Sequence, residues 1–166
     1  MRRARQRMGY MFLQRESKSA DHDIVVALAR EVVAGTYPAE AGWFDDIAAE
    51  HTKKPARLRL RAPVGMGVDL ALVTPAALAV LSFLATVVAG KAAEATVSTI
   101  GRSARRRLAA LMRREAVVEA LDVEQERLVF ELLTERAIGM GMSAVDAERL
   151  AGAIIGALRL RADHRG

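Results

Sequence analysis

Residues 70–90 read LALVTPAALAVLSFLATVVAG, twenty-one consecutive residues without a charged side chain. A helix that crosses a hydrocarbon layer about 30 Å thick needs roughly 20 apolar residues. Pro75 suits the first turn of a helix, and Thr74 is a favoured N-cap residue type. A helix that begins there has only about 15 residues, roughly 22 Å, before Lys91. The stretch therefore predicts a short membrane-inserted helix, the buried central helix of a soluble protein, or an interfacial segment.

The charges on either side of this stretch give no orientation for a membrane span. Five Lys or Arg residues lie within residues 50–69, and five lie within residues 91–110. The positive-inside rule compares such flanks, and here they are equal. Either orientation would have to carry a basic flank across the membrane, which argues against a simple single span.

One side of the central helix consists of small residues that recur at helical spacing. Small faces let two helix backbones approach closely, both in lipid and in water. Self-association into a homo-oligomer is one interpretation, and an internal contact with another helix of the chain is the other. The residues expected to form this face are Ser82, Ala85, Thr86, Ala89, Gly90 and Ala93.

The composition favours a helical protein. Hydrophobic residues make up 52% of the 166 residues but aromatic residues only 4%, so a core must be built from Ala, Val and Leu. These residues favour helices over sheets when β-branched and aromatic residues are few. The chain has no cysteine, which excludes disulfides, thiolate catalysis and cysteine-based zinc sites. We expect a mainly α fold, as one domain or as a small domain with an anchor.

The net charge of +5 is unevenly distributed. Positive residues cluster at 2–7, 53–61, 102–114 and 159–165, whereas residues 115–148 are rich in Asp and Glu. A concentrated positive field attracts anionic surfaces such as lipid headgroups or nucleic acid. The sequence therefore predicts an anionic partner for the basic part of the chain.

The helical patterns and breaks divide the chain into consecutive parts. The parts are a basic tail at 1–20 without an export signal, a short helical pair with an extended basic stretch at 21–63, a central helix continuing into a basic amphipathic helix at 64–120, and a helical hairpin at 121–166. Within the second part we expect helices at about 22–34 and 39–51. Trp43 and Phe44 are expected to close the small core between these two helices.

Residues 56–62 read ARLRLRA, in which Arg and Leu alternate. A period of two is typical of a strand with one basic face. Further along, the pattern from Lys91 to about Glu119 predicts a helix with a possible break at Gly101 and with a basic side opposite an apolar one. We expect an anion-binding surface made by Arg57, Arg59, Arg61, Arg102, Arg105, Arg106, Arg107, Arg113 and Arg114.

Two capping signatures organise the last part. Asp122 with Gln125 resembles a capping box and predicts a helix at about 123–138. Ser143 with Asp146 repeats the signature and predicts a second helix that reaches about Arg161. The short connection between them, which contains Gly139 and Gly141, predicts an antiparallel hairpin. Its acidic surface is expected to recruit a partner.

No pattern in the sequence supports enzyme chemistry. His22, His51 and His164 occur in unrelated contexts and are expected to face solvent. Gly65 and Gly67 lack the third glycine of a dinucleotide fingerprint and the lysine of a phosphate-binding loop. We expect no catalytic residues, no cofactor and no metal site.

These observations support two functional interpretations. The first is a membrane-associated, non-enzymatic adaptor whose apolar helix is an anchor, whose arginine-rich helix contacts anionic lipid, and whose bulk is cytoplasmic. The alternative is a soluble cytoplasmic subunit of a homo-oligomer or larger assembly that binds nucleic acid or an acidic protein. Nucleic acid is the less favoured partner, because no aromatic, Asn or Gln residues are interleaved with the arginines to read bases.

Overall fold

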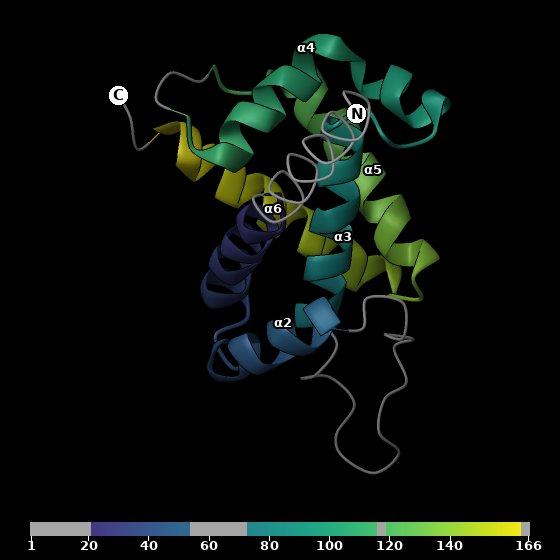
Figure 1. The fold of residues 1–166 in the computed structure, drawn as a ribbon. Coiled ribbons are helices and arrows are strands. Elements are labelled where there is room, and N and C mark those ends of the chain that lie inside the picture. The colour runs from purple at the N-terminus through teal and green to yellow at the C-terminus, as the bar shows by residue number, and fades with distance from the viewer. Residues whose placement is uncertain (1–20, 54–72, 116–118, 164–166) are drawn as a thin grey trace, which may run out of the picture.

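The computed structural model describes residues 21–53, 73–115 and 119–163, and these are mainly α-helical, as the composition predicts. The described residues include no strand, and the strand expected at 56–62 lies outside them. Figure 1 shows α3 in the middle of the molecule, with α4 across one end and α2 across the other. The helical elements are a helix at residues 21–36, η1 (Ala41–Trp43), α2 (Phe44–Lys53), α3 (Val73–Val88), α4 (Glu94–Arg113), α5 (Val123–Gly139) and α6 (Ala144–Asp163).

The 21–36 helix and α2 form the pair that the sequence predicts. Leu28, Val32 and their neighbours on one face of the 21–36 helix are buried, at the spacing of an amphipathic helix. Phe44 is 1% exposed and closes the core as expected. The same expectation is wrong for Trp43, which is 68% exposed because η1 turns it away from the core.

The central helix α3 is covered by other parts of the same chain. Ten of its sixteen residues are buried, and Leu78, Leu81 and Leu84 are almost completely inaccessible. Its neighbours include α2, α4 and α5. Within the described ranges, no helix is both long enough and apolar enough to cross a membrane. The predicted membrane-inserted segment is therefore not supported, since α3 spans only about 24 Å and its apolar side chains pack internally.

A buried carboxylate holds the beginning of α3. Glu40 is 4% exposed, and its Oε2 accepts hydrogen bonds from the Thr74 backbone N–H at 2.9 Å and from the Thr74 hydroxyl at 2.6 Å. The first N–H groups of a helix lack intrahelical partners and carry partial positive charge, so an anion there is favourable. Glu40 thus connects the loop before η1 to the central helix.

The chain turns sharply between α3 and α4, which lies across the end of α3 (Figure 1). Gly90 has φ +69°, and the N–H of Lys91 donates to the Thr86 carbonyl at 2.9 Å, which is the pattern of a glycine C-cap. The expectation that the central helix continues into the basic helix is wrong, because α3 ends at Val88 and α4 packs back against it. Gly101 (φ 75°, ψ 162°) then interrupts α4, at the break that the sequence suggested.

The α5–α6 hairpin agrees closely with the sequence. Asp122 and Gln125 form the complete capping box, and the Ser143 hydroxyl accepts a hydrogen bond from the Asp146 N–H at 3.1 Å. Val129 and Leu133 of α5 and Leu150 of α6 are fully buried. The helices are neighbours joined by a turn in which Gly141 has φ +98°, so the predicted hairpin is confirmed.

Candidate anion-binding surface

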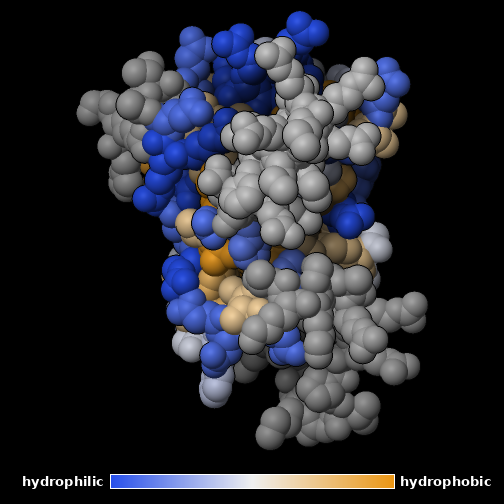
Figure 2. Space-filling model, viewed as in Figure 1, coloured by the Kyte–Doolittle hydropathy of each residue, from blue (hydrophilic) through white to orange (hydrophobic). Residues whose placement is uncertain are grey.

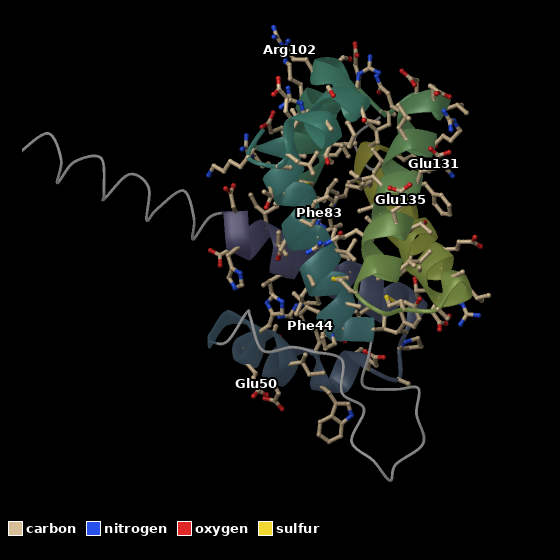
Figure 3. The ribbon with its side chains drawn as sticks, turned by 90° about the vertical axis from the view of Figure 1, so that its right-hand side faces the viewer. Phe44, Glu50, Phe83, Arg102, Glu131 and Glu135 are labelled. Atoms are coloured by element: carbon tan, nitrogen blue, oxygen red, sulfur yellow. The ribbon has the colours of Figure 1, made fainter. Side chains whose placement is uncertain are left out.

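The outward side of α4 presents arginines to solvent. Arg102, Arg106 and Arg113 are all exposed and, at intervals of four and seven residues after the Gly101 kink, fall on one side of the helix. We call these three residues the arginine stripe, which extends about 16 Å along the helix axis. Figure 2 shows hydrophilic residues over this end of the molecule, and Figure 3 shows Arg102 pointing away from it. The stripe is therefore accessible to a large partner.

The stripe differs from Arg107, Arg114 and Arg161 in its lack of close carboxylate partners. Arg102 and Arg106 make no ion pair with any carboxylate in the described part of the chain. Arg113 makes one long contact, 3.8 Å from its Nη1 to Glu115 Oε1, between two half-exposed side chains. A surface ion pair of this kind contributes little to the stability of the fold, and salt screens it. The positive charge of the stripe is thus largely available to a partner.

The apolar side of α4 is occupied. Leu108, Leu111 and Met112 are at most 4% exposed, and α4 packs against α3, α5 and α6. An amphipathic helix binds lipid by placing such residues in the membrane. Here the same residues form the protein core, so α4 offers an outward side that contains no large apolar residue between Arg102 and Arg113.

Arg107 is not part of the stripe, because its guanidinium makes contacts with other residues of the protein. Its Nη2 donates to Glu119 Oε2 at 2.6 Å, and its Nη1 donates to Gln125 Oε1 at 3.0 Å and lies 3.5 Å from Asp122 Oδ2. These partners include both residues of the capping box that starts α5. Arg107 therefore connects α4 to the beginning of α5, and its charge is already neutralised.

Arg114 is exposed, but it also has a carboxylate partner, in a group that we call the Glu31 cluster: Glu31, Arg114 and Arg161. Arg161 is 7% exposed and donates to both carboxylate oxygens of Glu31, at 2.8 and 2.9 Å, and to the Met112 carbonyl at 2.8 Å. Arg114 adopts the left-handed conformation that ends α4 (φ 54°) and pairs with Glu31. The cluster joins the 21–36 helix, the end of α4 and α6.

The remaining predicted arginines do not extend the stripe. Arg105 is half-buried, and its Nε is buried without a hydrogen-bond partner among the described residues. A Cβ on Gly90 would lie 3.0 Å from Arg105 Nη1, so the guanidinium packs over the C-terminus of α3, where partial negative charge stabilises a cation. Arg57, Arg59 and Arg61 lie outside the described residues.

The small-residue face of α3 is divided between the interior and the surface. Ser82 and Ala85 are half-buried, whereas the later members of the face, Thr86, Ala89, Gly90 and Ala93, are exposed. Ala85 and Ala89 line a shallow hollow between α3, α4 and the start of the 21–36 helix. The exposed part includes the turn made by Gly90. Self-association through this face stays a prediction.

The acidic surface of the hairpin is partly neutralised. Arg127 pairs with Glu124 and Glu131, and Arg159 donates to Glu126 from its Nε at 2.7 Å. The hydrogen bond from Arg159 keeps the pKa of Glu126 below its usual range. The recruitment of a partner by this surface stays a prediction, and Glu124, Glu126 and Glu131 already have arginine partners.

Burial shifts the pKa of two titratable groups in the described part of the chain. His51 is 9% exposed, contrary to the expectation that it faces solvent, and its burial lowers its pKa, with a smaller contribution from His22. Burial also raises the pKa of Tyr37. Among the described residues, no group of three or more His, Asp or Glu side chains is placed to hold a metal ion. The arginine stripe is therefore the strongest candidate site.

No local pattern in the sequence indicates the Glu31 cluster or the contact of Glu40 with Thr74. Each pair joins residues that are far apart in the chain and that occur in unremarkable local contexts. The chain matches no known family model, and comparisons with curated proteins and with solved structures found no match. The surface of the protein is consequently the only basis for inferring its function.

Proposed function

We propose that the protein is a non-enzymatic interaction module that binds an anionic partner through the arginine stripe of α4. The observation that carries the proposal is the exposure of Arg102 and Arg106 without carboxylate partners in the described structure. Guanidinium groups bind carboxylates and phosphates through two parallel hydrogen bonds, which makes free arginines on a rigid helix a good anion-binding surface. The net charge of +5 supports attraction of such a partner.

The rigidity of α4 supports this role. The core residues Leu108 and Leu111 fix the helix from inside, Arg107 fixes it to α5, and the Glu31 cluster fixes its end. The stripe is therefore held in position before any partner arrives, which lowers the entropic cost of binding. The apolar helix α3 has no part in the proposal, because its large side chains are covered by the same chain.

A column of immobilised heparin, a sulfated polyanion, tests the proposal. The variant Arg102→Glu/Arg106→Glu reverses two charges of the stripe and should elute at clearly lower salt than the wild type. The matched control is Arg136→Glu/Arg149→Glu, which changes two exposed arginines of the hairpin and gives the same net charge. If both variants elute at the same salt concentration, only net charge matters and the proposal is wrong.

A further inference from the structure

The residues on the outward side of α4 restrict the chemistry of the partner. Between the arginines of the stripe this side carries only Ser103, Ala109 and Ala110, and no Asp or Glu occurs from Arg102 to Arg113. The α4 side chains beside the arginines are thus short and uncharged, so no carboxylate of α4 itself repels a polyanion. Asp21 of the 21–36 helix lines a hollow together with Ala109 and Arg113, at one end of the stripe. The arginine stripe is a straight row of positive charges and not a pocket.

This surface lacks what a membrane or a protein partner requires. Peripheral helices hold to membranes by inserting large apolar residues beside their cations, and those of α4 are internal. The centres of protein–protein interfaces are rich in aromatic residues and Met, and the stripe has none. Exposed large apolar residues do occur on α5 and α6, away from the stripe on α4: Val123, Ile138, Val145 and Leu160.

Resting on the proposed function, we infer that the partner of the stripe is the phosphodiester backbone of double-stranded nucleic acid. A duplex carries one charge per about 1.7 Å of its axis, so a line about 16 Å long meets a dense row of phosphates. Arginine matches phosphate oxygens with two donors. The absence of Asn, Gln and aromatic residues on this side means that bases are not read, and binding is independent of sequence.

Salt dependence measures the number of phosphate contacts. Each contact with B-form DNA contributes about −0.9 to the slope of log K against log salt, so three arginines give a slope of about −2.7. Affinity then falls about 40-fold between about 50 and 200 mM salt. Other basic parts of the chain can add to the total slope, so the informative quantity is the change in slope when two stripe arginines are removed.

The experiment uses the full chain and a fluorescein-labelled DNA duplex of about two helical turns, followed by anisotropy across this salt range. Arg102→Gln/Arg106→Gln should reduce the steepness of the slope by about 1.8, because two contacts are lost. The matched control Arg136→Gln/Arg149→Gln should leave the slope unchanged. A second duplex of shuffled sequence should bind with an affinity within about threefold of that for the first duplex. An unchanged slope in the stripe variant would overturn the inference.

A parallel measurement separates this inference from the proposed function. Vesicles that contain phosphatidylglycerol are sedimented with the wild type and with the stripe variant. If vesicles bind through the stripe and the duplex does not, or if heparin alone binds through it, the nucleic-acid inference falls and the proposed function stands. If the stripe variant loses affinity for none of the three polyanions, both fall. Thermal melting of each variant checks that the fold is intact.

Discussion

The helices α3 and α4 are adjacent, and they use their side chains in opposite ways. The apolar helix α3 is enclosed, with Leu78, Leu81 and Leu84 inside the core. The polar helix α4 buries a narrow apolar side and presents Arg102 and Arg106 to solvent. In sequence, α3 is the more conspicuous element. A conspicuous apolar stretch can thus be the core of a small helical protein, while the proposed interaction surface lies on the neighbouring helix.

The largest expected effect tests the enclosed state of α3. Leu84→Ala should lower the free energy of unfolding by about 2 to 5 kcal/mol, because it leaves a cavity in a packed core. Thr86→Ala, two residues further along and exposed, is the matched control and should change stability by less than about 0.5 kcal/mol. Urea denaturation measures both. A loss below about 1 kcal/mol for Leu84→Ala would contradict the enclosure of α3.

The next effect concerns the anchoring of α4. Arg161→Met should lower the free energy of unfolding by about 3 kcal/mol, because it leaves Glu31 and two α4 carbonyls without their buried donor. Arg159→Met removes an arginine only two residues away whose pair with Glu126 is at the surface, and it should cost less than about 1 kcal/mol. Equal midpoints for the two variants in urea would show that burial of the cluster contributes nothing.

The kink in α4 should have an intermediate effect. Gly101 has φ 75° and ψ 162°, which is essentially accessible to glycine alone, so Gly101→Ala should cost about 1 to 3 kcal/mol. Gly152→Ala is the control, since Gly152 is helical and nothing lies within 4 Å of an added Cβ. That change should stabilise the protein by about 0.5 to 1 kcal/mol. Thermal denaturation measures both variants. A shift of the two melting temperatures in the same direction would exclude this backbone conformation of Gly101.

Acidification should lower the stability of the protein through His51 of α2, which is buried and lies near His22. Burial lowers the pKa of His51 below its unfolded value of about 6.5, so the unfolded chain binds the proton more readily. Stability is therefore full above about pH 6.5 and falls as the pH drops from there toward the folded pKa. The melting temperature of the wild type should decrease more between about pH 7.5 and 5.5 than that of His51→Gln. Parallel decreases would exclude His51 as the cause.

The smallest effect on stability belongs to the arginine stripe itself. Because Arg102 and Arg106 are exposed and unpaired within the described structure, Arg102→Gln/Arg106→Gln should change the free energy of unfolding by less than about 0.5 kcal/mol. Urea denaturation beside the wild type checks this. A larger loss would mean that these side chains support the fold, and the contrast between α3 and α4 would then disappear.

Local signals in the sequence were sufficient for part of this structure. The capping residues Asp122 and Ser143 identify α5 and α6, because each cap depends on atoms only three residues apart. A signal for the end of α3 is also present, since glycine is common just after the last residue of a helix. The spacing of small residues that includes Gly90 indicates a packing face instead, and it obscures the role of this glycine in the turn.

Other features could not be obtained from local patterns. The arginines of α4 form one charge cluster in sequence, and only the fold distinguishes Arg102, which is free, from Arg107, which is paired with Glu119. The contact of Glu40 with Thr74 joins residues 34 positions apart and depends on how α2 is placed on α3. Which charges remain available for a partner is thus a tertiary property, and so was the candidate site.

The pair between Glu31 and Arg161 joins residues 130 positions apart, and this has a consequence for synthesis on the ribosome. At about 5 to 20 residues per second, Glu31 is made roughly 7 to 26 s before its partner. During that interval the 21–36 helix can pack against nascent α2 and α3 but cannot close onto α6. The emerging chain therefore exposes an apolar surface for seconds, and a chaperone that shields it should raise the yield of folded protein.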